Sequence, residues 1–141
     1  MDMVVKYLAV YLAALVTFLI IDAVWLGLVA RSFYVQQLGD LLRPEPNFGV
    51  AGLFYILYVI GVVVFAVLPA AEQQSWVTAM LLGALFGFIA YGTYDLTNLA
   101  TLANWPVLVS VVDMIWGSVL TAFVALAGYS AARVMFAGPT P

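Results

Sequence analysis

Three aspartates lie inside apolar segments long enough to cross a membrane: Asp22, Asp95 and Asp113. A charge near the centre of a bilayer costs about 2.5–3.5 kcal/mol on insertion scales, so carboxyls at such depth are candidate functional groups that could hold a proton or a cation. The chain has no histidine and four Lys and Arg residues in all. Near these carboxyls, Arg31 and Arg43 are the available basic partners. At least one carboxyl must therefore be protonated, cation-bound, hydrated or hydrogen-bonded, and a protonated form near neutral pH is our expectation unless a cation is bound.

Asp95 belongs to a helical row of polar and aromatic residues. Tyr91, Tyr94, Asp95 and Asn98 follow the spacing i, i+3, i+4, i+7, which places them on one face of a helix. We expect Tyr91, Tyr94 and Asn98 to orient the carboxyls. The alternative is that Asp95 and Asn98, with Thr97, merely end a helix at the membrane interface.

Asp22 and Asp113 share a second pattern. Each precedes a tryptophan by three residues, Trp25 and Trp116, and a glycine follows each tryptophan. The two matches suggest a faint internal repeat, and they predict that both tryptophans form walls of a site around the carboxyls. The glycines could simply make room for a neighbouring helix.

Tyr55 and Tyr58 fall at a depth similar to that of the aspartates, early in the second apolar segment. They are candidates for ligand binding, and the alternative is that they are core aromatics whose hydroxyls bond to a neighbouring backbone. For Tyr34, Trp76 and Trp105 we prefer the interface belt that Tyr and Trp form in many membrane proteins. We prefer the same belt for Trp25, which is at the same time a candidate wall of the site.

The composition predicts an integral membrane protein with one domain. The chain is 67% hydrophobic and 8% charged, with a mean hydropathy of +1.15, whereas a soluble domain is about 25% charged. A helix needs about 20 apolar residues to span the hydrocarbon. Four stretches satisfy this requirement, and they run over about 4–30, 50–68, 75–98 and 107–135.

These stretches predict an all-α, four-helix transmembrane bundle, because an open sheet cannot satisfy its backbone in lipid. Pro69 is expected to stop the second helix, Ser75 to cap the third, and Pro106 to occupy the first turn of the fourth. Residues 31–49 are expected to form a polar loop. The first segment is too long for a signal peptide and is expected to be retained.

Four spans place both termini on one side of the membrane and residues 31–49 and 99–106 on the other, which we call the loop-1 side. All three aspartates then lie in the half of the membrane nearest the loop-1 side. Two basic residues lie on each side, so the count does not decide the orientation. We favour cytoplasmic termini because Lys6 precedes the first span.

Several classes of function lack support in the sequence. Cysteine and histidine are absent, which excludes thiol chemistry and the usual haem and zinc ligands. No basic run supports nucleic-acid binding. A carboxylate site for Mg²⁺, Mn²⁺ or Ca²⁺ ranks below protonation, so no metal ligand is assigned and the cofactor is unknown. Gly83 and Gly87 form a GxxxG pattern that marks close helix packing, unless they face lipid.

Several stretches together resemble one family of small bacterial inner-membrane proteins, domain-of-unknown-function family 2177. They are Tyr91-Gly-Thr-Tyr-Asp-Leu-Thr-Asn98, Trp105-Pro106, Val112-Asp113-Met-Ile-Trp116-Gly117, Asp22-Ala-Val-Trp25-Leu-Gly27 and Phe54-Tyr55. The resemblance covers nearly the whole chain and implies four transmembrane helices in a bacterial inner membrane. Genes of this family lie near those of cyclopropane-fatty-acid-synthase-like enzymes and flavin-dependent oxidoreductases, which suggests a role near acyl-chain modification or the stress response.

The leading hypothesis is a small membrane protein whose Asp, Tyr and Asn pocket, open toward the loop-1 side, binds or modifies a lipid or another apolar small molecule. Whether it is an enzyme stays open. A second hypothesis is a proton-coupled transporter of a small solute, which at this length would work as a homo-oligomer. A third is a non-enzymatic subunit of a larger membrane complex.

Overall fold

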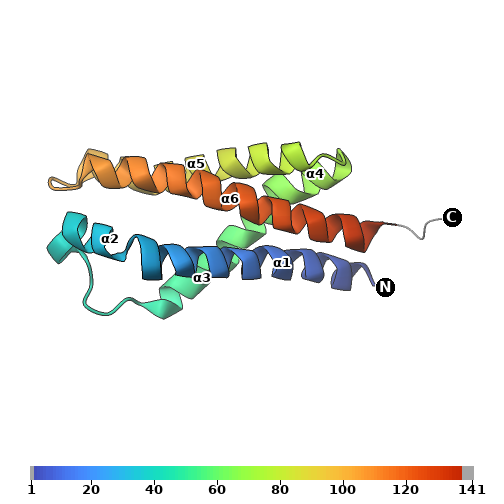
Figure 1. The fold of residues 1–141 in the computed structure, drawn as a ribbon, viewed down its shortest axis with the longest axis horizontal. Coiled ribbons are helices and arrows are strands. Elements are labelled where there is room, and N and C mark those ends of the chain that lie inside the picture. The colour runs from blue at the N-terminus through green and yellow to red at the C-terminus, as the bar shows by residue number, and fades with distance from the viewer. Residues whose placement is uncertain (1, 138–141) are drawn as a thin grey trace.

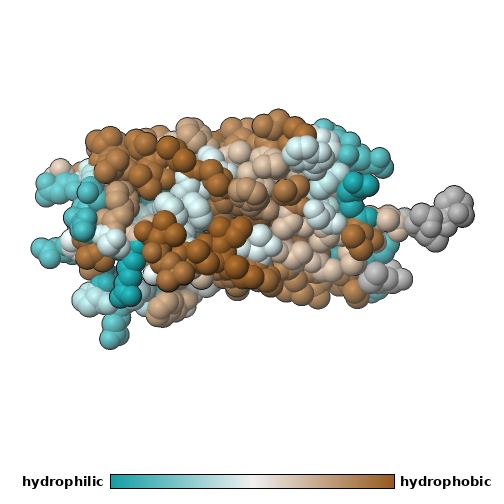
Figure 2. All heavy atoms as spheres, in the orientation of Figure 1, coloured by the Kyte–Doolittle hydropathy of each residue, from teal (hydrophilic) through white to brown (hydrophobic). Residues whose placement is uncertain are grey.

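The computed structural model describes residues 2–137, and these form a bundle of four membrane-length helices. The four spans are Met3–Val29, Phe48–Glu72, Trp76–Thr101 and Val107–Phe136. The first, third and fourth spans run lengthwise, and the second crosses them obliquely (Figure 1). The start of the first span and the end of the fourth lie at the same end of the bundle. Polar side chains gather at the two ends and apolar ones cover the middle (Figure 2). The prediction of an all-α transmembrane bundle is confirmed.

The first two spans each contain a π-helical turn. In the first, α1 (Met3–Val24) continues as the π-turn η1 (Trp25–Val29), where the N–H of Ala30 bonds to the carbonyl of Trp25. In the second, α3 (Phe48–Val62), the π-turn η3 (Val63–Val67) and α4 (Leu68–Glu72) follow without a break. The last two spans are the unbroken helices α5 (Trp76–Thr101) and α6 (Val107–Phe136).

The prediction that Pro69 stops the second helix is wrong. The helix continues to Glu72, and Pro69 occupies the first turn of α4. A proline ring ordinarily clashes with the carbonyl four residues earlier, here that of Phe65. Phe65 lies in the wider π-turn Val63–Val67, which takes that carbonyl out of α-helical register and so accommodates the ring.

The connection 31–49 is not a simple polar loop. It holds the helix α2 (Arg31–Leu38) and a 3₁₀ turn (Gly39–Leu41), and Gly39 ends α2 with a φ of 47° that favours glycine. The predicted cap is confirmed at Ser75, whose Oγ accepts the N–H of Thr78 at 3.1 Å. Pro106 precedes α6 as its cap residue instead of lying in the first turn.

Helix α6 is the centre of the bundle, and α5 lies against it most closely. A Cβ atom added to Gly83 would lie 2.6 Å from the backbone oxygen of Thr121, and one added to Gly87 would lie 2.0 Å from that of Gly117. Both glycines are buried. The alternative that they face lipid is therefore excluded, and the small residues allow the two backbones to meet.

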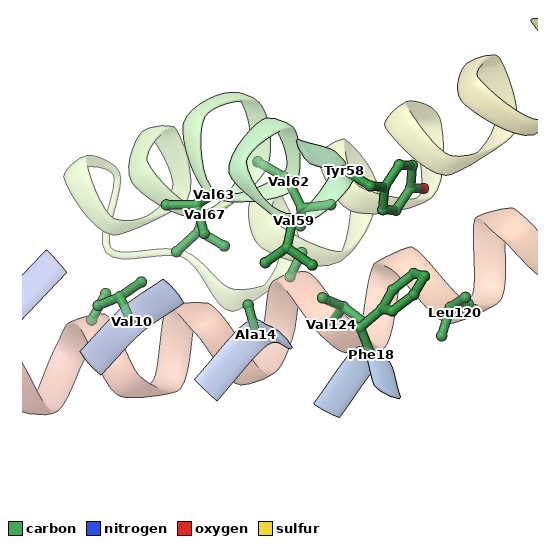
Figure 3. Packing of buried hydrophobic residues seen from close by; sticks show 13 residues of the cluster. Val10, Ala14, Phe18, Tyr58, Val59, Val62, Val63, Val67, Leu120 and Val124 are labelled. Carbon is green, nitrogen blue, oxygen red and sulfur yellow. The ribbon is translucent and has the colours of Figure 1, made fainter. Parts of the chain in front are cut away.

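The apolar core fills the part of the bundle between the aspartates and the end at which the first span starts. Fully buried side chains from α1, α3 and α6 interlock there, as Figure 3 shows for Val10, Ala14, Phe18, Val59, Val62, Leu120 and Val124. Tyr58 is part of this core, and its hydroxyl lies 2.6 Å from Oγ1 of Thr121. Because Thr121 donates its own proton to the carbonyl of Gly117, the Tyr58 hydroxyl is the donor in this pair. Tyr58 thus packs as a core aromatic, with its hydroxyl bonded to a side chain instead of the backbone.

Candidate functional site

A cavity of about 580 Å³ opens at the loop-1 end of the bundle, among α1, η1, α2, α3, α5 and α6. Seven of the ten predicted site residues line it: Asp22, Trp25, Tyr55, Tyr91, Tyr94, Asp113 and Trp116. The other three, Tyr58, Asp95 and Asn98, are not part of the lining. Five of the other eight lining residues are aliphatic, and they come from η1, α2, the segment after Gly39–Leu41, α3 and α5.

Asp22 is held at the cavity by two donors from other helices. It is 6% exposed. The Tyr55 hydroxyl donates to its Oδ2 at 2.9 Å, and Nε1 of Trp116 donates to its Oδ1 at 3.5 Å. Hydrogen bonds to a carboxylate compensate part of the cost of removing it from water. These two donors fix the carboxyl with one oxygen toward α3 and the other toward α6.

Asp113 is held by Tyr34, a residue that the sequence analysis assigned to the interface belt. The Tyr34 hydroxyl donates to Oδ1 of Asp113, and Nε1 of Trp25 donates to the Tyr34 oxygen at 3.2 Å. Burial, and then the hydrogen bond to Asp113, raise the pKa of the Tyr34 hydroxyl well above its usual value. Tyr34 therefore remains a proton donor, and the belt assignment is corrected.

Trp25 and Trp116 stack face to face, with ring centroids 4.1 Å apart and an interplanar angle of 9°. Helices α1 and α6 run in opposite directions (Figure 1), so each tryptophan is level with the aspartate of the other helix. Trp116 donates directly to Asp22, and Trp25 reaches Asp113 through Tyr34. The two Asp-x-x-Trp patterns thus form one crossed unit, which explains their equal spacing without requiring a duplication.

The glycines that follow the two tryptophans have different surroundings. A Cβ atom added to Gly117 would lie 2.3 Å from Cδ2 of Tyr91, so Gly117 makes room for that ring. At Gly27 an added Cβ would meet nothing within 4 Å. The packing interpretation therefore holds for Gly117 alone, and it fixes Tyr91 beside the cavity.

Asp95 lies behind Asp113, away from the cavity. Asp95 is 0% exposed, and neither of its carboxyl oxygens has a hydrogen-bond donor within residues 2–137. The neighbouring polar group is the carboxyl of Asp113. Two carboxylates are both acceptors and cannot bond to each other. A single proton held between them would give each carboxyl a hydrogen-bond partner.

The polar residues that share a helix face with Asp95 do not hold its carboxyl. Contrary to expectation, Tyr91, Tyr94 and Asn98 donate no hydrogen bond to its carboxyl in the described chain. Tyr94 is 57% exposed and meets Trp105 edge to face, with ring centroids 5.5 Å apart.

Trp105 is buried instead of belonging to an interface belt, with 8% of its surface exposed. Its Nε1 donates to Oγ of Ser110 at 3.0 Å, and Ser110 donates to the backbone carbonyl of Asp95 at 3.2 Å. This chain of hydrogen bonds ties the end of α5 to the start of α6. The burial of a tryptophan side chain just before Pro106 carries no clear signal in the sequence.

The three carboxyls lack basic neighbours. Within the described part of the chain no Lys or Arg is among the groups that act on their charge. No group of three or more His, Cys, Asp or Glu side chains between residues 2 and 137 is close enough to hold a metal ion. Asp22 and Asp113 share one cavity, with Asp95 in contact with Asp113. The arrangement can accept hydrogen bonds from a ligand and can hold a proton.

Comparison with known proteins gives one match. The model of a family described as predicted membrane protein (DUF2177) matches residues 7–130. No curated protein and no solved structure matches the chain.

Proposed function

We propose, from the premise that this chain belongs to the predicted membrane protein family DUF2177, that it binds a lipid or another apolar small molecule in the cavity at its loop-1 end. Asp22 and Asp113 would be the polar contacts of this ligand, and Trp25 and Trp116 would form the wall between them. The chain is a multi-pass membrane protein. The bacterial inner membrane is part of the proposal and rests on the family resemblance.

The observation that carries the proposal is the make-up of the cavity. Its volume of about 580 Å³ falls in the range of about 300–1,000 Å³ that small-molecule sites occupy. Such sites combine an apolar lining with a few convergent polar groups. Here aliphatic and aromatic residues line the same space as two aspartates. An apolar chain with a polar head suits this lining.

The proposal includes the link to acyl chains that the resemblance suggested. An acyl chain is an apolar body of the kind that the lining accommodates, and a role near acyl-chain modification or the stress response would bring such chains to the site. In a modifying reaction, the Asp95–Asp113 pair would be the group that holds or releases a proton. Binding alone requires no such step.

The position of the carboxyls distinguishes the alternatives. Asp22 and Asp113 face an internal cavity, which favours a ligand over docking of a partner subunit. Transport would require a path to the other side of the membrane. Below the cavity, Phe18 and Leu120 are fully buried in a continuous core, so the cavity opens to one side in this conformation. Binding is the function that this geometry favours.

A substitution that fills the cavity tests the proposal. Ala51 lines the cavity from α3, and Ala51→Trp would occupy the ligand's space. Ala23 lies on the exposed surface of α1 and outside the lining, so Ala23→Trp is the matched control.

The three proteins would be transferred from native membranes into nanodiscs, and molecules that remain bound would be identified by native mass spectrometry. We expect the unmodified protein and Ala23→Trp to retain an amphiphile that Ala51→Trp loses. Equal retention by all three proteins, or none by any, would overturn the proposal.

A further inference from the structure

We infer that the head group taken by this cavity is a positively charged amine, attached to an apolar chain. The inference rests on the proposed function and specifies its ligand. It follows from the charge of the cavity, from the unused acceptor capacity of its carboxyls, and from the aromatic surfaces around them.

The charge of the cavity is uncompensated. Asp22 and Asp113 both line it, and its lining contains no Lys or Arg. Asp95 adds a third carboxyl next to Asp113. A pair of carboxyls that shared one proton would still carry one negative charge. An anionic head would add to this charge, and a neutral head would leave it unchanged. A cation is the head group that offsets it.

The carboxyls have acceptor sites left for a ligand. A carboxylate offers about four lone-pair sites. Asp22 accepts from Tyr55 and Trp116, and Asp113 accepts from Tyr34 among the described side chains outside the aspartate pair. An ammonium group carries up to three N–H donors, whereas a hydroxyl carries one. Charge-assisted bonds of this kind are about twice as strong as neutral ones.

The aromatic lining favours the same head group. Eight of the fifteen residues that line the cavity are Trp, Tyr or Phe. The faces of such rings attract a cation placed within about 6 Å of the ring centre. Trp25 and Trp116 cover each other on one face, so each indole has at most its other face left for a ligand. An aliphatic lining would accommodate the chain equally well and would not favour charge.

The aliphatic residues define where the chain of the ligand lies. Leu26, Leu38, Leu42 and Ala51 line the cavity from η1, α2, the segment after Gly39–Leu41 and α3. Asp22 and Asp113 supply the polar contacts of the same cavity, so an amphiphilic amine matches its lining.

Three probes with the same chain and different heads test the inference. Dodecylamine, dodecanol and dodecanoate would be added in equal amounts to the protein in nanodiscs of zwitterionic lipid at pH 7. Retention of each would be measured by native mass spectrometry and normalised to its uptake by empty nanodiscs. We expect the amine to be retained about tenfold over the alcohol, which corresponds to about 1.4 kcal/mol, and dodecanoate least.

Two variants distinguish binding of the amine in the cavity from its uptake by the bilayer. Asp22→Asn removes a charge from the cavity and keeps the shape and an acceptor for Tyr55, so it should reduce the preference for the amine severalfold. Asp2→Asn makes the same chemical change on an exposed residue at the opposite end of α1 and should leave the preference intact.

Each outcome decides one claim. Equal retention of amine and alcohol, a preference for dodecanoate, or a preference for the amine that survives Asp22→Asn would overturn the amine inference while the proposed function stands. Retention of none of the three probes would count against the proposed function as well.

Discussion

Replacing Gly87 should separate helices α5 and α6 at the point where they lie closest. An added Cβ atom would be 2.0 Å from the backbone oxygen of Gly117 and 2.5 Å from Oγ1 of Thr121. The first of these atoms belongs to the backbone of a 30-residue helix, which cannot rotate away as a flexible side chain can. Even alanine therefore requires the helices to move apart.

The expected magnitude combines two opposing effects. Inserting a methyl group into a well-packed interior costs about 1–3 kcal/mol, and contact with backbone places Gly87→Ala near the upper limit. Alanine is about 1 kcal/mol more favourable than glycine in a helix, which offsets part of this cost. We therefore expect Gly87→Ala to lower the free energy of unfolding by about 2 kcal/mol, and Gly87→Leu to lower it further.

Equilibrium unfolding by SDS in mixed micelles, together with thermal melting in detergent, measures this effect. Gly27→Ala is the matched control, because an added Cβ there meets nothing within 4 Å. Ile89→Leu is the control for the leucine variant, because Ile89 is 58% exposed. Stability of Gly87→Ala equal to that of the unmodified protein and Gly27→Ala would show that α5 and α6 do not meet at the glycines.

The remaining predictions concern the site. A carboxylic C=O band in infrared spectra at pH 7 should disappear in Asp95→Asn, because that amide can donate to Asp113 without a shared proton; a persistent band would contradict the pairing. Since the folded-state pKa of Tyr34 is raised, its contribution to stability is present below about pH 10, the unfolded value, and is lost as pH rises toward the folded value. Tyr34→Phe should therefore flatten the alkaline loss of stability, and an unchanged pH profile would refute this. Trp116→Phe removes one of the two stacked indoles and should abolish the exciton feature of the Trp25–Trp116 pair in circular dichroism. An exciton feature that persists in this variant would show that it does not come from this pair.

The four spans could be predicted from the sequence because the thickness of the bilayer sets the length of an apolar helix. The polar connection could not be predicted as well. Helix α2 has eight residues, too few to be stable on its own. The hydrogen bond from Tyr34 to Asp113 ties it to α6, and that residue lies 79 positions away in sequence. No local pattern contains this contact.

The aspartates and their tryptophans could be identified because a carboxyl in lipid is costly and the three-residue spacing places each pair on one face of a helix. Helix rotation could not be derived in the same way. It directs Tyr58 into the core and leaves Asn98 outside the cavity lining. Tyr34 and Trp105 were assigned to the interface belt because aromatic residues near a span end are usually explained by it.

The hydrogen bonds of Asp22 also have a consequence for biosynthesis. Its donors Tyr55 and Trp116 come 33 and 94 residues later in the chain. Ribosomes add about 5–20 residues per second, so the 94 residues to Trp116 take about 5–20 s of translation. The span Met3–Val29 must enter the bilayer while its carboxyl still lacks both donors. An 18-residue stretch of this span has a mean hydropathy of 2.4, which supplies the drive for insertion during that interval. The carboxyl gains its last donor only when the final span has been made.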